Sequence, residues 1–462
     1  MSRSIPVTTI GACLLLGTLG ALGIAPEARA ATLTPTNCND SGAGSLRAAV
    51  TSATSGDTID LRPLACHRIV LTTGAIMIPQ ASLTVRGPGY ARFAVSGNYS
   101  SSVFRHDGTG TLHLRGLTIE QGQHRAEMAN GGCIFTAGNF DGNDIHVRHC
   151  GAYARLDALG GGIYAAGNIT LFYSAVYDNG AKGRSSGGGG LTLGTIVPGT
   201  ADLVGGDLRM HRSRVFRNVA ASGGGLRALG SVDITYSSIS DNHARVSSGA
   251  MDVFNHGTGT PSRIAYSTIS GNTAVNSIGG FNLSPNTSIE NSTISGNAAP
   301  FIGLGQIIGP GTIVNSTITA NVTTTGFDTN CFPGVLTLYG EFHVESSILA
   351  GNTCLGGISR DVTGQDTNSG PFPRPPPTVI LGSDNLVQNS IFVTLPADTI
   401  RNTDAMLGPL ADNGGRTLTH RPLSGSPAIN RGNNVAGFDV DQRGEGFPRV
   451  VGGRADIGAV ER

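Results

Sequence analysis

One short phrase recurs along the chain, and its spacing constrains the fold more than any other feature. Its closest copies each carry an Ile, a second Ile five residues later and an Asn three residues after that; they begin at Ile234, Ile264, Ile289 and Ile313. With looser copies on both sides, the phrase has nine centres: Ile119, Cys150, Val176, Val215, Ile239, Ile269, Ile294, Ile318 and Leu349. Neighbouring centres are 24 to 39 residues apart. A fixed minimum with variable insertions predicts a stack of similar coils joined by loops.

The pattern inside the phrase indicates strands. Val232 and Ile234 alternate with Asp233 and Thr235, which fits short strands joined by a bend and not a helical face of period about 3.6. Coils stacked about 4.8 Å apart would bury the apolar columns and pair each strand with those above and below it. We therefore predict an all-β fold, a right-handed parallel β-helix. Propeller blades of about 40 to 45 residues would be too long for these spacings.

The start of the chain is typical of a secretory signal. An apolar stretch runs from Ile10 to Ile24, and Ala28-Arg29-Ala30 provides a cleavage site. We expect an exported, extracellular protein, with the periplasm and the cell surface as alternative locations. No later segment approaches the roughly 20 uninterrupted apolar residues that span a bilayer, so we expect no transmembrane segment.

The division of the chain follows from these patterns. A short helix begins at Ser45, carries Leu46 and Val50 on one face and ends before Gly56, so it can cap the first coil. The expected regions are a signal peptide (1–30), an N-terminal cap (31–61), the β-helix (62–356), a Pro-rich loop or linker (357–380), and terminal coils with a C-terminal module (381–462).

The cysteines favour disulfides over a metal site. Six remain after signal removal, and an even count is typical of disulfides in an exported chain, although six thiols allow 15 pairings. No C-x-x-C pair accompanies them as a zinc site would require. Neighbours along the chain suggest the pairs Cys38 with Cys66, Cys133 with Cys150, and Cys331 with Cys354.

Asn and Gly recur at fixed places in the repeat. An Asn falls three residues after most centres, and we interpret the column as structural, with left-handed backbone and local bonds to turn amides. The column contains Asn179, Asn218, Asn242, Asn272, Asn297, Asn321 and Asn352. Gly clusters precede Ile163, Leu191, Leu226 and Phe281, and we expect them at turns with positive φ.

Several segments resemble known families of exported proteins. Segments such as Gly160-Gly-Gly-Ile163, alternating with Val-Phe-Arg-Asn218, resemble polymorphic outer-membrane protein repeats, which belong to β-helical surface proteins. Cys38-Asn-Asp-Ser-Gly-Ala-Gly-Ser-Leu-Arg47 resembles the CSLREA-type start of secreted bacterial β-helix proteins. The last 80 or so residues resemble the choice-of-anchor Q domain through Leu407-Gly-Pro-Leu-Ala-Asp-Asn-Gly-Gly, Ser424-Gly-Ser-Pro-Ala-Ile-Asn430, Asp441-Gln-Arg-Gly444 and Asp456-Ile-Gly-Ala-Val-Glu461. These resemblances imply a secreted bacterial β-helix protein.

Composition limits the partners. The 31 basic and 31 acidic side chains cancel, which excludes a nucleic-acid binder driven by bulk positive charge. Trp is absent, so stacking on sugars would depend on the tyrosines. We expect a monomer that binds a polysaccharide or a surface protein.

Counting back six and four residues from each centre predicts two outward columns of side chains. They bring Arg209, His211, Asp233 and Arg263 within two coils of one another, roughly 10 Å. In a lyase acting on uronic acids, Arg209 or Arg263 could neutralise the substrate carboxylate and His211 could remove the neighbouring proton. Alternatively, these charges simply pair at a solvated surface.

Further candidates complete this site. Candidate ligand-binding residues are Tyr173, Lys182, Tyr236, Tyr266 and Glu290, with Lys182 in an insertion after Val176 that we expect to overhang the wall. We expect no cofactor; the acidic cluster nearest to a calcium site is Asp439, Asp441 and Glu445.

Three functions remain open from the sequence. We predict first a non-catalytic surface or matrix protein that binds polysaccharide or a protein partner through its long wall and inserted loops. The alternative is a polysaccharide lyase or glycosidase that uses the Arg209, His211, Asp233 and Arg263 wall. The third is an exported structural protein that binds nothing.

Overall fold

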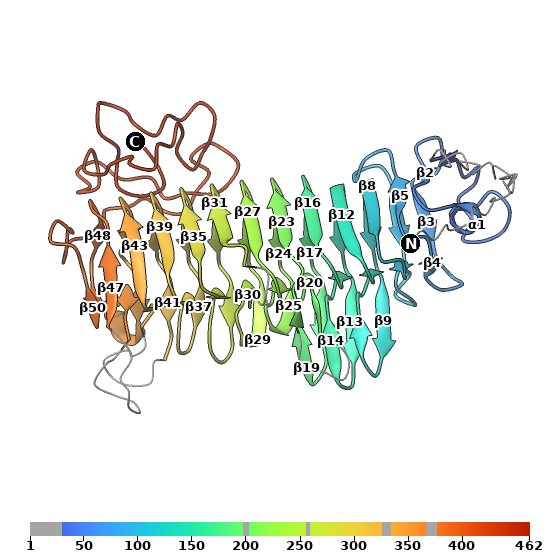
Figure 1. Cartoon of the computed structure of the whole chain (residues 1–462), viewed down its shortest axis with the longest axis horizontal. Helices are drawn as coiled ribbons and strands as arrows, with labels where there is room; N and C mark the ends of the chain where they lie inside the picture. Colours follow the sequence, from blue (N-terminus) through green and yellow to red (C-terminus); the bar gives the residue numbers. More distant parts are fainter. Residues whose placement is uncertain (1–29, 197–202, 256–258, 326–333, 366–376) are drawn as a thin grey trace, which may run out of the picture.

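The chain forms a parallel β-helix, as predicted (Figure 1). The computed structural model describes residues 30–196, 203–255, 259–325, 334–365 and 377–462. In these ranges the strands form a 24-stranded sheet, two 12-stranded sheets and one two-stranded sheet. The large sheet bends into two faces, which β8 and β12 join because both strands run through the bend. A complete coil therefore passes through four strand positions.

The first face of the large sheet contains β1 (Thr32–Leu33), β2 (Thr58–Asp60), β5 (Leu83–Arg86), β8 (Thr111–Glu120), β12 (Asn139–Arg148), β16 (Ile169–Phe172), β23 (Leu208–His211), β27 (Val232–Thr235), β31 (Ser262–Ala265), β35 (Thr287–Glu290), β39 (Gly311–Val314), β43 (Glu341–Glu345), β47 (Thr378–Leu381) and β50 (Val393–Thr394). The second face contains β3 (Arg68–Val70), β6 (Ala94–Ser96), the ends of β8 and β12, β17 (Ala175–Tyr177), β24 (Arg214–Phe216), β28 (Ser238–Ser240), β32 (Thr268–Ser270), β36 (Thr293–Ser295), β40 (Thr317–Thr319), β44 (Ile348–Leu349) and β48 (Leu386–Val387).

The third sheet contains β9 (Gln123–Ala126), β10 (Ala129–Asn130), β13 (Gly151–Ala154), β14 (Asp157–Leu159), β18 (Gly180–Lys182), β19 (Ser185–Gly187), β25 (Val219–Ser222), β29 (His243–Ser247), β33 (Thr273–Ala274), β37 (Ala298–Ala299), β41 (Val322–Thr323) and β45 (Thr353–Cys354). The fourth contains β4 (Ile76–Ile78), β7 (Phe104–His106), β11 (Ile134–Thr136), β15 (Ile163–Ala165), β20 (Leu191–Leu193), β26 (Leu226–Ala228), β30 (Met251–Val253), β34 (Phe281–Leu283), β38 (Gly305–Ile308), β42 (Leu336–Tyr339), β46 (Val362–Thr363) and β49 (Ser390–Ile391). Outside them lie β21 (Thr195–Ile196), β22 (Leu203–Val204), α1 (Leu46–Ser52) and a 3₁₀ turn, η1 (Leu355–Gly357).

The repeat centres form a buried column. Ile239, Ile269, Ile294 and Ile318 are paired in register from one coil to the next, and all four are at most 1% exposed. One coil alone could not cover these side chains, so burial couples every coil to its neighbours.

The asparagine column is structural, but its cause differs from the expected one. The residue before each Asn, such as Asp241 before Asn242, takes the left-handed backbone, not the Asn itself. The Asn side chains point inward and form an asparagine ladder: Asn242 Nδ2 donates to Asn272 Oδ1 at 2.9 Å and to the Val215 carbonyl at 3.0 Å. The ladder stabilises the corner because each amide satisfies backbone groups of the adjacent coils.

Serines form a second ladder at the corner between the two faces of the large sheet. The Ser213 N–H donates to Ser237 Oγ at 3.0 Å, and the Ser237 N–H donates to Ser267 Oγ at 3.1 Å. The residue before each serine again has positive φ, as in Arg212 and Tyr236. At this corner, the side chain of the residue before each serine therefore points outward.

The asparagine ladder ends on a carboxyl group. Asp361 Oδ1 accepts from the Asn352 N–H at 2.8 Å and from Asn352 Nδ2 at 2.9 Å, and Oδ2 accepts from Ser359 Oγ and the Asn389 N–H. Burial raises the pKa of Asp361 to about 6, against the opposing effect of these hydrogen bonds. The carboxyl group stands where the next coil would place an Asn.

This raised pKa predicts a pH-dependent stability. In the unfolded chain an Asp titrates near pH 4, so between about pH 4 and 6 the folded state binds more protons and loses stability as the pH rises. Relative to the Asp361→Asn variant, we expect the wild type to lose about 2 kcal/mol of unfolding free energy as the pH rises through this range. Urea unfolding at a series of pH values measures the difference, and a constant difference would contradict the prediction.

Glycines serve two purposes at the start of the fourth sheet. Gly188 and Gly223 have positive φ, as expected, but Gly189 does not. A Cβ atom on Gly189 would lie 2.3 Å from the Gly224 carbonyl oxygen of the next coil. Close approach of neighbouring coils, as well as the turn, therefore requires glycine here.

The N-terminal helix caps the solenoid as expected. Ser45 Oγ accepts from the Ala48 N–H, and Leu46 and Val50 are buried against the first coils. Parallel pairing already links β1 to β2 and β2 to β5, so strands of the solenoid begin upstream of residue 62. Residues 362–363 and 378–380 likewise belong to coils of the solenoid, through β46 and β47.

Two of the expected disulfides are confirmed. Cys38 is bonded to Cys66, and Cys133 to Cys150. Cys331, the expected partner of Cys354, lies outside the described residues, as do residues 1–29 of the expected signal peptide. No helix in the described part of the chain is long and apolar enough to cross a membrane.

The C-terminal module, residues 396–462, leaves the stack after Ile400, which still pairs in parallel with Leu386 of β48. It folds back along the solenoid and lies beside the ends of β31 to β43 (Figure 1). Its contacts include Gln442 with Thr293 and His420 with Ser295, both on outward positions of the second face. The module therefore covers part of that face and leaves the remainder open.

Candidate functional site

The predicted wall residues lie on adjacent coils of the first face. Arg209 is paired in register with Asp233, and Asp233 with Arg263. Arg263 Nη2 lies 2.7 Å from Glu290 Oε2, and Arg263 Nη1 lies 3.9 Å from Asp233 Oδ1. Two carboxylates thus hold Arg263, whereas Arg209 forms no ion pair among the described residues and lies over the Phe172 ring.

One of the predicted centres is wrong, because Cys150 is not in the apolar column. Val147 pairs with Ile119 and Val176, and Cys150 occupies the Asn position, where its N–H donates to Asn179 Oδ1 at 3.0 Å. Counting back six residues from Cys150 would place Asp144 in the outward column two coils before Arg209, but the register places Asp141 there.

This shift uncovers a charged cluster that the sequence did not predict. Asp141 Oδ2 lies 2.9 Å from His113 Nδ1 and 2.9 Å from Arg115 Nη2. These hydrogen bonds and charges hold the pKa of Asp141 below its usual value although burial opposes them.

The predicted tyrosines line the corner between the two faces of the large sheet. Tyr173, Tyr236 and Tyr266 all have positive φ, which turns their rings outward. Tyr236 and Tyr266 stack with ring centroids 4.7 Å apart. His211 contacts Tyr173 and Tyr236 edge to face, at 6.3 Å and 5.8 Å.

Lys182 is not part of this arrangement. It is exposed at the end of β18 in the third sheet, where it pairs with Tyr153 of β13. The part of the insertion that contains Lys182 and Ser185–Gly187 lies in the third sheet and not over the wall as expected, because β18 and β19 pair with β13 and β14. Residues 197–202 of the same insertion lie outside the described residues. The C-terminal module overhangs instead.

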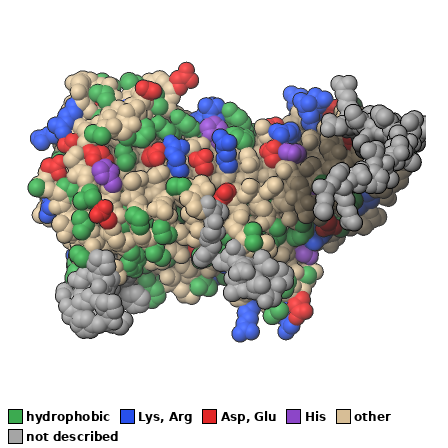
Figure 2. All heavy atoms as spheres, in the orientation of Figure 1, with side chains coloured by type: hydrophobic (Ala, Val, Ile, Leu, Met, Phe, Trp, Pro, Cys, Tyr) green, Lys and Arg blue, Asp and Glu red, His purple; other side chains and the backbone are tan. Residues whose placement is uncertain are grey.

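A hollow of about 180 Å³ lies where the module meets the corner. It is lined by three arginines, three tyrosines and one histidine, with no carboxylate: Tyr90, His146, Tyr173, Ser174, Ala175, Arg212, Ser213, Arg214, Tyr236, Ser238, Arg416 and Thr417. A second hollow of about 380 Å³ shares Arg214, Arg416 and other residues with it and extends under the module segment Asp412–Leu418. We call the two together the arginine groove. On the face in Figure 2, arginine and histidine side chains gather beside the module.

The arginines of the groove are available to a ligand. Among the described residues, Arg212, Arg214 and Arg416 form no ion pair; Arg212 Nη1 donates only to the Tyr173 hydroxyl, at 2.8 Å. The neighbouring Arg217 is exposed and is paired with Asp178, with its Nε 2.7 Å from Asp178 Oδ1. In the smaller hollow, three guanidinium groups therefore lie together with no carboxylate in the lining.

The histidines show the effect of this positive charge. Burial, together with Arg148 and Arg214, lowers the pKa of His146 to about 4. Burial and the charges of Arg212, Arg209 and Arg416 also lower the pKa of His211. Both imidazoles are neutral at neutral pH, so arginine supplies the positive charge.

Aromatic rings continue along the same side of the solenoid. Tyr90 stacks on His146 at 3.8 Å, and Tyr177 stacks on Phe216 at 4.7 Å. Flat rings beside guanidinium groups suit a ligand that has both apolar faces and anionic groups.

The sequence reasoning missed most of this groove. Arg212, Arg214 and Arg217 lie in one coil together with Arg209, and this local excess of arginine could have marked them. Arg416 could not have been assigned in this way, because it reaches the groove from the C-terminal module.

In the acidic cluster nearest to a calcium site, Asp441 is paired with an arginine. Asp441 Oδ2 lies 2.6 Å from Arg443 Nη2 and accepts from the Glu461 N–H at 2.8 Å. Asp441 therefore already has a cation beside it. Among the described residues there is no group of three or more His, Cys, Asp or Glu side chains that could hold a metal ion.

Comparisons with known proteins identify no family for this chain. No family model matches the chain, and no curated protein matches it. Among solved structures it is similar to the PL6 family alginate lyase AlyGC, with 12% identity over 84% of this chain, 55% of that chain and a TM-score of 0.45. It is also similar to the pectate lyase Pel9A, with 15% identity over 94% of this chain, 98% of that chain and a TM-score of 0.36. The chain spans about half the length of the alginate lyase, and at these identities the likeness concerns the fold alone.

Proposed function

We propose that this protein binds an acidic polysaccharide in the arginine groove. The observation that carries the proposal is the meeting of Arg212, Arg214 and Arg416 with three tyrosines in a hollow without a carboxylate. Guanidinium groups bind carboxylates or sulfates in two-point contacts, and tyrosine rings can lie against sugar rings. A long polymer suits the site because the groove follows the solenoid axis across several coils.

Export is part of the proposal. The two disulfides indicate an oxidising compartment, and the first 30 residues are typical of a secretory signal. Outside the cell or at its surface, the protein would meet acidic polysaccharides directly. A surface protein as partner is the alternative ligand for the same groove.

Binding to immobilised polysaccharides tests the proposal. We expect the protein to bind polygalacturonate, alginate or hyaluronate and not neutral dextran, with affinity that falls as salt increases. Each charged hydrogen bond lost is worth about 1.5–3 kcal/mol, so Arg214→Gln and Arg416→Gln should each weaken binding about tenfold or more.

The matched control is Arg184→Gln. Arg184 is an exposed arginine of the insertion after Val176, away from the groove, and its replacement removes the same charge. Binding should be unchanged. Equal losses in all three variants would indicate attraction by net charge alone and would contradict a specific groove. No binding to any acidic polymer would contradict a polysaccharide ligand and leave a surface protein partner or a structural protein that binds nothing.

A lyase remains the second candidate, favoured by the state of His211. Its Nδ1 is held by Thr235 Oγ1 at 2.8 Å, and its lowered pKa keeps Nε2 free of a second proton at neutral pH. With a uronate carboxylate neutralised by Arg209, His211 would remove the C5 proton, the C4–O bond would break, and a C4–C5 double bond would form. The departing oxygen would take up a proton from solvent.

The same polysaccharides distinguish binder from lyase. Unsaturated uronates absorb in the ultraviolet, and their formation can be followed over time. Product that disappears in both His211→Ala and Arg209→Ala would establish the lyase. Binding without product would support the non-catalytic function that we propose first.

A further inference from the structure

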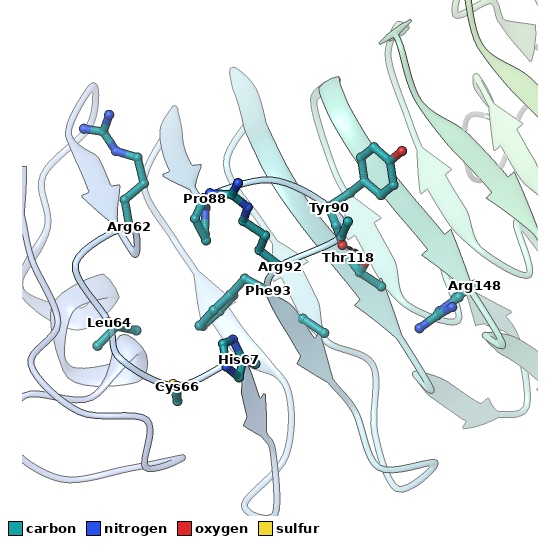
Figure 3. A pocket seen from close by; sticks show the side chains of 12 residues that line it. Arg62, Leu64, Cys66, His67, Pro88, Tyr90, Arg92, Phe93, Thr118 and Arg148 are labelled. Carbon is teal, nitrogen blue, oxygen red and sulfur yellow. Dashed lines mark hydrogen bonds between the residues drawn. The ribbon is translucent and has the colours of Figure 1, made fainter.

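The arginine groove belongs to a longer path along the second face of the large sheet. A hollow of about 570 Å³ lies toward the N-terminal cap and shares Tyr90 with the groove. Figure 3 shows Arg62 on one side of this hollow and Tyr90 and Arg148 on the opposite side. The segment around Tyr90 crosses the face between the two hollows, since Thr118 Oγ1 donates to the Tyr90 carbonyl at 2.8 Å and the Tyr90 ring stacks on His146. The path therefore passes from the hollow in Figure 3 over the Tyr90 ring into the groove.

The register of the strands gives the length of this path. Successive outward positions from β6 to β28 are paired coil by coil: Ala94, Thr118, His146, Ala175, Arg214 and Ser238. Five intervals of about 4.8 Å make roughly 24 Å. Several sugar residues of an extended chain could lie along it.

The C-terminal module closes one end of the path. Thr268 Oγ1 donates to the Leu418 carbonyl at 2.6 Å, where the segment Asp412–Leu418 crosses the face. On the next two coils, Thr293 contacts Gln442 at 2.5 Å and Thr317 accepts from the Ala459 N–H at 3.0 Å. Both threonines are at most 1% exposed, so no ligand can lie on these coils.

The other end of the path is open. The outward residues of the preceding strand, Arg68 and Val70 in β3, are exposed, and so is His67. The segment Arg62–His67 borders the hollow on this side, and both Arg62 and His67 are exposed.

The closed end is also where polar groups are densest. Arg214, Arg217 and Arg416 meet there with the carboxylates of Asp241 and Asp412. Guanidinium groups suit an acidic sugar, and carboxylates can accept from its ring hydroxyls. A site that offers both is equipped to recognise one particular sugar residue instead of a repeating backbone.

We infer that the groove recognises the end of an acidic polysaccharide chain, with the terminal sugar against the segment Asp412–Leu418 and the following sugars extending toward the N-terminal cap. This inference rests on the proposed function, since it states how the same groove holds its ligand. The module is then the part that turns an open wall into an end-specific site.

Calorimetry with sized fractions of polygalacturonate and hyaluronate, all longer than the path, tests this inference. We expect one protein to bind per chain whatever the chain length. In a competition experiment, chains of every length should inhibit binding to an immobilised polysaccharide equally at the same molar concentration of chains. Long chains should therefore inhibit binding less per gram than short chains. A number of bound proteins that grows in proportion to chain length, with equal inhibition per gram, would overturn end recognition and leave the proposed function intact.

Failure of the proposed function gives a different result, namely no heat of binding with any fraction. The variant Arg416→Gln adds a second check at the closed end. We expect its affinity for chains to fall at least tenfold while one protein per chain is retained. Unchanged affinity would show that the ligand does not reach the module and would also overturn the inference.

Discussion

Replacement of Asn297 by leucine should lower the free energy of unfolding by about 4 kcal/mol, because the substitution breaks the asparagine ladder in the middle of the solenoid. Asn297 Oδ1 accepts from the Asn272 N–H at 3.1 Å and from Asn272 Nδ2 at 2.9 Å, and Asn297 Nδ2 donates to the Ile269 carbonyl at 3.1 Å. Leucine has a similar volume but satisfies none of these groups. Each buried group left without a partner costs about 1–3 kcal/mol.

Equilibrium unfolding in urea measures this loss, and the same coil supplies the control. Asn276→Leu makes the identical chemical change at an exposed position, where we expect an effect within about 0.5 kcal/mol. Similar losses in both variants would show that leucine itself, and not the broken ladder, destabilises the protein. Unfolding of a solenoid can pass through partly unfolded states, so fluorescence and circular dichroism should be compared in each titration.

Features that depend on the repeat could be predicted from the sequence. The register of Arg209, Asp233 and Arg263 followed correctly from the spacing of the phrase, since every coil must place its centre in the same buried column. The spacing gave a wrong centre where another residue type replaced the Asn. Cys150 occupies the Asn position and is bonded to Cys133, so this coil lacks the side-chain amide that marks the corner in the other coils.

Features that depend on contacts between distant segments could not be predicted in this way. Thr268 and Leu418 are 150 positions apart, and no periodicity relates the C-terminal module to the coils that it covers. The groove therefore appeared in the sequence only as scattered arginines. The tyrosine column could be recognised in the sequence. The positive φ of the residue before each ladder serine, which turns these side chains outward, could not.

The C-terminal module depends on a buried charged cluster, which the terminal motifs encode. Arg449 is fully buried; its Nη1 donates to the Gly458 carbonyl at 2.8 Å and its Nη2 to the Asp456 carbonyl at 2.7 Å. Glu461 lies 3.4 Å from the same guanidinium group. Burial raises the pKa of Glu461 and lowers that of Arg449, and the charge of each residue opposes the shift of the other.

Arg449→Met should therefore destabilise the module by about 3–5 kcal/mol, because it leaves Glu461 and two carbonyl groups buried without their cation. We expect limited proteolysis to cut within residues 396–462 while the solenoid stays protected and keeps its β-sheet circular dichroism. Binding to acidic polysaccharide should fall as well, since the variant displaces Arg416 from the groove.

The exposed Arg421 of the same module provides the control, and Arg421→Met should leave both protease resistance and binding unchanged. If Arg449→Met loses the protected module but binds with full affinity and in proportion to chain length, the module is not part of the ligand site. If it loses binding together with the module, a segment that folds back from the far end of the chain determines what the solenoid wall can hold.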